Sequence, residues 1–211
     1  HELNNPLYGI MNTLELLKSE VPPENKRRKL LDMSLSEIVR LADMLKKMLS
    51  FSKPEQEIKR LVNVITIVDE ILMLHEKQLQ EHSIKIKTEY AEAVEDVYAS
   101  TNQLRQVFLN MVSNARDAMP EGGTLTVRIY SEKGFVFVEF ADTGVGIAKD
   151  NLDKIFDSFF TTKSSVKGVG LGLSVCYGFI RDHGGDITVE SRQHEGARFR
   201  ISLPVESSSK A

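Results

Sequence analysis

The spacing of apolar residues predicts a helix at the start of the chain. Its apolar residues follow one another at alternating steps of four and three positions: Leu3, Leu7, Ile10, Leu14 and Leu17. This spacing is typical of one apolar seam along a helix that packs in a coiled coil or a bundle. Pro22 and Pro23 end the helix, because proline cannot continue the backbone hydrogen-bond ladder.

A second helix with its own apolar seam follows the two prolines. Its seam consists of Leu31, Leu35, Ile38, Ala42, Leu45 and Leu49, and the face is widened by Leu41, Met44 and Met48. Two helices bury too little apolar surface to be stable alone. We therefore expect the hairpin to pair with a second copy in a dimeric four-helix bundle.

A polar segment around Pro54 separates the hairpin from a second domain. We predict a dimerisation hairpin over residues 1–53, a linker over 54–60, a second domain over 61–205 and a polar tail over 206–211. In the second domain, helical spacing occurs over 64–79, 103–119 and 171–183, and strand-like alternation over 84–87, 125–129, 135–140, 187–189 and 198–203. Because helices and mostly hairpin-linked strands are segregated, we predict an α+β domain, one sheet with helices on one face.

Composition narrows the possible classes of protein. The 211 residues are 41% hydrophobic with a formal net charge of -3, which is typical of a globular chain. We find no basic stripe interleaved with aromatic residues and no apolar stretch near the roughly 20 residues of a membrane span, so we expect no nucleic-acid binding and no membrane contact. A single cysteine, Cys176, cannot form a disulfide within the chain, and we expect a cytoplasmic location, which leaves open a membrane anchor elsewhere in the parent protein.

His1 is the first candidate for chemistry. It lies two positions, about 200° around a helix, before the seam residue Leu3, so we expect it to face away from the bundle core, with Asn5 on the same exposed face. An exposed neutral imidazole can accept a phosphoryl group, and Glu2 can hold the proton of the other ring nitrogen. A zinc site of the His-Glu-x-x-His type is excluded by Asn5. A solvated histidine without function would show the same pattern.

Asn110 and Asn114 are a second candidate pair. One helical turn places both side chains on a common face of the predicted helix. Amide oxygens are suitable ligands for a Mg²⁺ ion that stays partly hydrated and bridges nucleotide phosphates. Asparagines that only form internal hydrogen bonds have the same spacing, so the spacing alone leaves both interpretations open.

Asp142 follows a predicted strand and precedes Gly144 and Gly146. A carboxylate at the end of a strand can accept the exocyclic amine of adenine. The oxygen of guanine at that position would face the carboxylate without a proton between them, so the residue favours ATP over GTP. The alternative is an ordinary Asp-Thr-Gly turn.

A long polar connector between Ile147 and Gly168 has the character of a hinged lid. Its apolar residues are Ile155, Phe156, Phe159, Phe160 and Val166. Such side chains can dock on the domain when a nucleotide binds, and Lys163 can then reach the terminal phosphate. Gly168, Gly170 and Gly172 leave backbone amides free for phosphate oxygens at the start of the next helix. A solvated lysine and ordinary core phenylalanines are the alternatives.

Taken in order, these motifs resemble those of sensor histidine kinases of two-component systems over nearly the whole chain. Residues 1–7 resemble the H box, 110–115 the N box, 142–147 the G1 box, 155–160 the F box and 168–173 the G2 box. The hairpin resembles the family's dimerisation and phosphotransfer domain, and the second domain its α/β-sandwich ATP-binding domain. Residues 114–119, 160–163 and 183–186 are most similar to the nitrogen-regulation-type subgroup.

The resemblance implies that the chain is a homodimeric protein-histidine kinase. It would phosphorylate His1 from ATP and Mg²⁺ and pass the group to an aspartate on the receiver domain of a response regulator. The implied catalytic residues are His1, Glu2 and Asn5, with Asn5 positioning a water that dephosphorylates the regulator. Asn114 is the implied metal ligand. The implied nucleotide-binding residues are Asn110, Asn114, Asp117, Asp142, Gly144, Gly146, Ile147, Lys163, Gly168, Val169, Gly170, Leu171 and Gly172.

Two alternative functions stay open. ATP-hydrolysing machines share this ATP-binding fold, but they carry a glutamate general base where this chain has Asn110, so transfer to His1 is favoured. A pseudokinase that binds nucleotide or a regulator as a scaffold is disfavoured by the intact motifs. Family members carry further helical turns before the phosphoacceptor, so we expect this chain to be a fragment without its sensor region.

Overall fold

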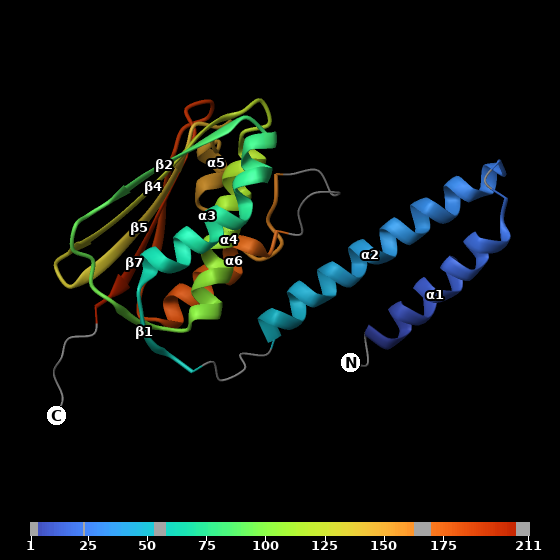
Figure 1. Cartoon of the computed structure of the whole chain (residues 1–211), viewed down its shortest axis with the longest axis horizontal. Coiled ribbons are helices and arrows are strands. Elements are labelled where there is room, and N and C mark those ends of the chain that lie inside the picture. The colour runs from blue at the N-terminus through green and yellow to red at the C-terminus, as the bar shows by residue number, and fades with distance from the viewer. Residues whose placement is uncertain (1–3, 23, 53–57, 163–169, 206–211) are drawn as a thin grey trace. The chain divides into compact units, whose positions relative to one another are not determined.

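The computed structural model of the protein describes residues 4–22, 24–52, 58–162 and 170–205. The chain divides into two compact units, residues 1–55 and 56–211, and each is described by itself (Figure 1). Arg60, which we assigned to the linker, is already the first residue of a strand. Within the described ranges, no helix is long and apolar enough to cross a membrane.

The first unit is the predicted helical hairpin. It consists of α1 (Asn4–Glu20) and α2 (Lys26–Ser52). Arg28 of α2 donates a hydrogen bond to the carbonyl oxygen of Lys18 at 3.1 Å, and the Lys18 ammonium pairs with Asp32 at 2.6 Å. These polar contacts hold the two helices together beside the loop that joins them.

The apolar seam of this hairpin is only partly covered within one chain. The half-buried seam residues are Leu14, Leu31, Leu35 and Ile38. Ile10 and Leu17 belong to the same predicted seam, yet 51% and 45% of their surfaces remain exposed. A single hairpin therefore leaves apolar surface that another set of helices can cover.

The second unit is built on a five-stranded sheet with the order β2-β4-β5-β7-β6. Its strands are β2 (Ile84–Tyr90), β4 (Gly123–Glu132), β5 (Phe135–Asp142), β6 (Asp186–Ser191) and β7 (Ala197–Pro204). β2 and β4 are parallel, and the other neighbours are antiparallel. One face is covered by α3 (Val64–Glu81), α4 (Thr101–Ala118) and α6 (Gly172–Asp182), as Figure 1 shows. The predicted α+β architecture is confirmed.

Three short elements were not predicted. β1 (Arg60–Val62) and β3 (Val97–Ala99) form a separate antiparallel two-stranded sheet, and α5 (Lys149–Leu152) lies in the connector after β5. Elements of three or four residues are too short to show a hydrophobic period, so periodicity cannot reveal them.

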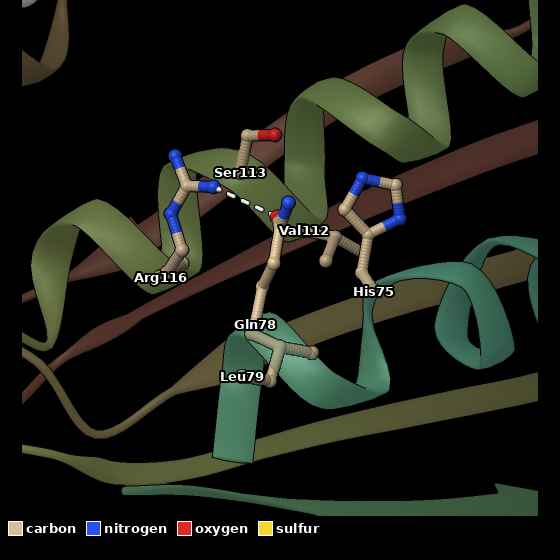
Figure 2. A pocket seen from close by; sticks show the side chains of 6 residues that line it. All are labelled: His75, Gln78, Leu79, Val112, Ser113 and Arg116. Atoms are coloured by element: carbon tan, nitrogen blue, oxygen red, sulfur yellow. Dashed lines mark hydrogen bonds between the residues drawn. The ribbon is translucent and has the colours of Figure 1, made fainter. Parts of the chain in front are cut away.

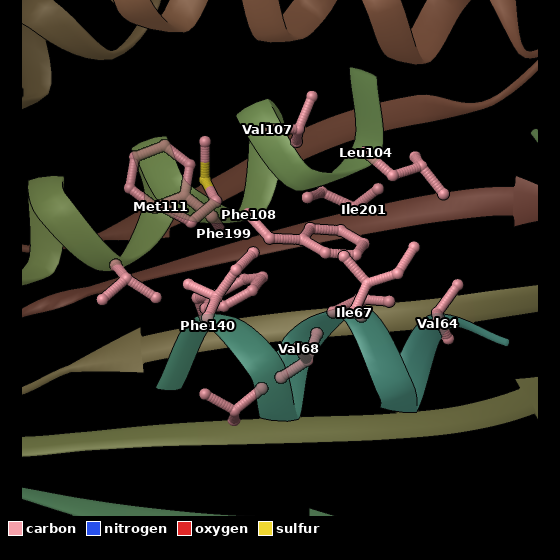
Figure 3. Close-up of a cluster of buried hydrophobic side chains, with 14 of the residues drawn as sticks. Val64, Ile67, Val68, Leu104, Val107, Phe108, Met111, Phe140, Phe199 and Ile201 are labelled. Carbon is pink, nitrogen blue, oxygen red and sulfur yellow. The ribbon is translucent and has the colours of Figure 1, made fainter. Parts of the chain in front are cut away.

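The core lies between the sheet and the helices. Val136, Val138 and Phe140 alternate along β5 with residues of the opposite face and are buried on the helix side. Phe108 of α4 and Phe140 pack with ring centroids 5.8 Å apart (Figure 3). This packing fixes α4 on the sheet and so positions the residues on its outer turns.

Candidate functional site

Asp142 owes its position to the alternation of β5. It lies two residues after Phe140, so its side chain points to the same helix-covered side of the sheet. Its surface is 8% exposed, and one carboxylate oxygen accepts a hydrogen bond from the Gly144 N–H at 2.9 Å. Burial raises the pKa of Asp142, while hydrogen bonds from the backbone N–H groups of Gly144 and Ala197 act in the opposite direction.

Gly144 packs the loop after β5 against the end of α4. A Cβ atom on Gly144 would lie 2.3 Å from the Ala118 carbonyl oxygen, which accepts a hydrogen bond from Val145. No larger residue fits this close approach. Gly144 thus has a packing role that holds the Asp142 loop in place.

Gly146 and Ile147 attach the same loop to the turn between β6 and β7. Gly146 has φ +66°, and a Cβ atom there would lie 2.0 Å from the Arg192 carbonyl oxygen. The Ile147 N–H donates to the Ser191 hydroxyl at 2.9 Å. The glycines of this motif are therefore explained by backbone packing around Asp142.

Asn110 lies on α4 where the first turn of α6 meets it. Its Nδ2 group donates to Cys176 Sγ at 3.3 Å, and a Cβ atom on Gly172 would lie 2.6 Å from its Oδ1 atom. Burial raises the pKa of the Cys176 thiol to about 12, so the sulfur remains a protonated, inert acceptor. The structure thus brings Asn110 and Gly172 together.

Asn114 and Asp117 continue the same helix. Asn114 lies one turn after Asn110 on α4 and takes part in polar interactions. The Asp117 carboxylate accepts hydrogen bonds from Arg116 at 2.8 and 3.2 Å. Among the described residues, no group of three or more His, Cys, Asp or Glu side chains could hold a metal ion.

The connector returns to the start of α6 through aromatic contacts. The Phe156 ring packs on Tyr177 of α6 with centroids 5.5 Å apart. The Phe159 N–H donates to the Gly170 carbonyl at 2.8 Å, and a Cβ atom on Gly170, which has φ +73°, would lie 2.4 Å from Phe159. Leu171 precedes α6 as a buried cap residue, and its apolar side chain makes no hydrogen bond to the first turn of the helix.

Several predicted site residues lie outside the described residues: His1, Glu2, Lys163, Gly168 and Val169. Asn5 lies in the first turn of α1. The described part of the candidate site therefore consists of Asp142 and its loop, the outer face of α4 and the start of α6.

Sequence reasoning missed two residues of this site. Ala197 donates to Asp142 and is its register partner across β5 and β7, which only the strand pairing reveals. Cys176 lies one turn after Gly172 on α6, but helical spacing alone does not show that it faces Asn110.

A small surface hollow lies between α3 and α4 (Figure 2). Its lining consists of His75, Gln78, Leu79, Val112, Ser113 and Arg116, and Figure 2 shows Arg116 donating to Gln78 at 3.5 Å. Of these residues, Arg116 belongs to the segment 114–119 that the sequence analysis singled out, and it also donates to the candidate site residue Asp117. Its lining does not include Asp142, Asn110 or Gly172.

Two family models match the chain. Residues 99–207 match the histidine kinase-, DNA gyrase B- and HSP90-like ATPase family, and residues 1–57 match the His Kinase A phospho-acceptor domain. The two matches together cover most of the chain, in the order hairpin, then ATPase domain.

Named relatives agree with these two matches. Sporulation kinase A of Bacillus subtilis is 36% identical, over 97% of this chain and 33% of that protein. The sensor histidine kinase ZraS of Escherichia coli is 30% identical, over 97% of this chain and 44% of that protein. The chain thus spans less than half the length of these relatives.

A solved structure extends the comparison to both units. The crystal structure of the histidine kinase ThkA in complex with the response regulator protein TrrA matches with a TM-score of 0.72 and 28% identity, over 97% of this chain and 59% of that chain. The likeness therefore includes the hairpin as well as the second unit.

Proposed function

The chain belongs to the sensor histidine kinases as a catalytic core, and we propose that it phosphorylates His1 from ATP and passes the group to a response regulator. The observation that carries this proposal is the pairing, in one chain, of a phospho-acceptor hairpin with an ATP-binding fold that has a buried carboxylate at Asp142. The regulator as partner is supported by the complex of ThkA with TrrA.

We propose that the Asp142 carboxylate recognises the adenine base by accepting a hydrogen bond from its exocyclic amine. The Gly144 and Ala197 N–H groups hold its carboxylate and still leave acceptor capacity for the adenine amine. Because the group is buried, a guanine oxygen opposite it would leave two acceptors facing each other without solvent. We therefore expect ATP to be preferred over GTP.

Asn114 is the proposed Mg²⁺ ligand, beside Asn110. A site with neutral amide oxygens fits a Mg²⁺ ion that takes its other ligands from water and phosphates. When bound, this ion would neutralise charge on the phosphates during transfer. The first-turn N–H groups of α6, next to Gly172, are the proposed donors to phosphate oxygens.

In the proposed reaction an unprotonated ring nitrogen of His1 attacks the γ-phosphorus, and the bond to the bridging oxygen of ADP breaks. Glu2 holds the proton of the other ring nitrogen, and Lys163 neutralises charge on the transferred group. Positioning and charge neutralisation supply most of the catalysis in such transfers.

Asn110 favours transfer over ATP hydrolysis. A carboxamide cannot accept a proton from water as a glutamate does, and its Nδ2 group is already engaged with Cys176. We therefore expect little steady phosphate release.

The exposed seam residues Ile10 and Leu17 support a homodimer through the hairpin.

We further propose that Asn5 positions a water for regulator dephosphorylation and that the protein works in the cytoplasm. The nitrogen-regulation-type subgroup is also a proposal, since the relatives include a sporulation kinase as well as ZraS.

The test is incubation with γ-labelled ATP and Mg²⁺ for the chain and its His1→Gln variant. We expect acid-labile, base-stable label that the variant lacks. Phosphate release without any protein label would instead identify an ATPase. Nucleotide binding without turnover would identify a pseudokinase.

A further inference from the structure

A buried histidine lies at the opposite end of α6 from Gly172. His183 is the residue after α6, and 6% of its surface is exposed. Its Nδ1 atom lies 2.6 Å from the Phe179 carbonyl oxygen, and its Nε2 atom accepts a hydrogen bond from the Ser100 N–H at 2.9 Å. An N–H can only donate, so Nε2 is unprotonated and the ring proton is on Nδ1.

The partner of this ring is the first residue of another helix. Ser100 is the N-cap of α4, its side chain accepts a hydrogen bond from the Gln103 N–H at 3.2 Å, and its surface is 1% exposed. The backbone N–H of an N-cap residue lies outside the helical hydrogen-bond pattern. His183 therefore satisfies a buried donor and joins the end of α6 to the start of α4.

The two glycines after His183 end α6 at this residue. Gly184 has φ +71°, and its N–H donates to the Arg181 carbonyl at 2.9 Å. A Cβ atom on Gly185 would lie 2.1 Å from the Ser202 carbonyl oxygen of β7. Because Gly184 has a left-handed conformation and Gly185 packs closely against β7, the helix cannot continue past His183.

The same two helices meet again at the candidate nucleotide site. There Gly172 lies against Asn110, which donates to Cys176. α6 has 11 residues and spans about 16 Å, so contacts at both ends fix its position along α4. We propose that His183 is a positioning residue, which holds α6 in the register that places its first turn beside Asn110.

This proposal deepens the proposed function, because it rests on nucleotide binding at the start of α6. Its effect should reach the nucleotide through a helix shift and not through direct contact. Loss of the Ser100 bond would then weaken nucleotide binding as well as the fold.

His82 provides a matched control. It is the residue after α3, and its Nδ1 atom lies 2.8 Å from the Gln78 carbonyl oxygen, which is the same local arrangement as in His183. Its side chain is exposed and bonds to its own helix. Substitution of His82 thus removes the local contact without affecting the link between α4 and α6.

The experiment compares the full chain with His183→Met, His183→Gln and His82→Met. Calorimetry gives the Kd for ADP with Mg²⁺ at a temperature where each variant is folded, and label incorporation gives KM for ATP and kcat. We expect His183→Met to weaken ADP binding about tenfold. The buried Ser100 N–H loses its partner, and α6 is then no longer held in the position that places its first turn beside Asn110. Glutamine can accept from the Ser100 N–H and should restore most of the affinity, and His82→Met should bind as the unsubstituted chain does.

Unchanged ADP affinity in a folded but less stable His183→Met variant would overturn the proposal, since His183 would then act on stability alone. If His183→Met does not fold, His183→Gln and His183→Asn decide, because the shorter asparagine cannot reach Ser100. Equal affinity in these two would also overturn it. Absence of label on His1 in every chain would contradict the kinase proposal, while the ADP affinities would still test the role of His183.

Discussion

The two units of the chain bury their apolar residues to very different extents. In the hairpin, Leu16 and Leu30 are 66% and 62% exposed, whereas Leu104 and Phe108 of the second unit are fully buried. The second unit therefore encloses its own core, but the hairpin has apolar surface to share with another chain. We therefore expect the proposed nucleotide site to be complete within one chain and the proposed phosphoacceptor hairpin to depend on association.

The largest effect should come from the core of the second unit. Phe108→Ala removes a fully buried ring that packs on Phe140, and we expect a loss of about 3–5 kcal/mol in the free energy of unfolding. Phe135→Ala is the control, because Phe135 lies on the outer face of the sheet and is partly exposed. Denaturant titration checks both. Equal losses in the two variants would contradict the self-contained core.

The next largest effect concerns the candidate base site. Asp142→Asn should weaken ATP binding about 100-fold, because the adenine amine loses its charged acceptor and meets an amide donor. Calorimetry with ATP and Mg²⁺ measures this loss. Binding within threefold of the unsubstituted chain would remove Asp142 from the site.

Although Asp142→Asn should weaken ATP binding, it should increase the free energy of unfolding at neutral pH. Burial raises the pKa of Asp142 above its ordinary value in the folded chain. The folded state thus binds the proton more tightly, so stability is lost as pH rises from the ordinary pKa through the raised one. We expect Asp142→Asn to be more stable than the unsubstituted chain at pH 7 and the difference to disappear near pH 3. Lower stability of the variant at pH 7 would contradict this sign.

Association of the hairpin should depend on protein concentration, whereas the fold of the second unit should not. Leu17→Gln should destabilise the dimer by about 2 kcal/mol, since two copies of an apolar side chain are lost from one shared core. Met73→Gln is the matched control, because Met73 of α3 is 80% exposed. Sedimentation equilibrium measures the dimer constant. A monomeric unsubstituted chain at all concentrations would refute the dependence on association.

The smallest effect should come from the contact between α6 and Asn110. Gly172→Ala places a Cβ atom 2.6 Å from Asn110 Oδ1, and we expect about tenfold weaker ADP binding. Gly178→Ala on the same helix meets no atom within 4 Å and should leave binding unchanged while stabilising the helix slightly. If Gly178→Ala weakened binding equally, the contact at Gly172 would have no special role.

The sequence was most informative where a pattern of apolar residues repeats over a long segment. The seams of α1 and α2 and the alternation of β5 predicted these elements, because several turns or residues repeat the same pattern. The motif around Asp142 also predicted a loop at the end of a strand. The packing roles of Gly144 and Gly146 could not be predicted, because the carbonyl groups they approach come from distant segments.

Contacts between helices and strands that are distant in the sequence could not be predicted either. Neither Ala197 beside Asp142 nor Cys176 beside Asn110 has a local signal, since both depend on strand register and helix packing. The proposed phosphoacceptor, His1, lies outside the described residues, so its proposed role rests on the resemblance and the family match.

The most direct test measures nucleotide affinity and protein label together in two variants, each of which affects one unit. We predict that His1→Gln binds ATP with Mg²⁺ as the unsubstituted chain does but carries no label. Asp142→Asn should retain His1 and yet bind ATP about 100-fold more weakly and carry much less label. Label that persists in His1→Gln would contradict the account, because the phosphoryl group would then be on another residue.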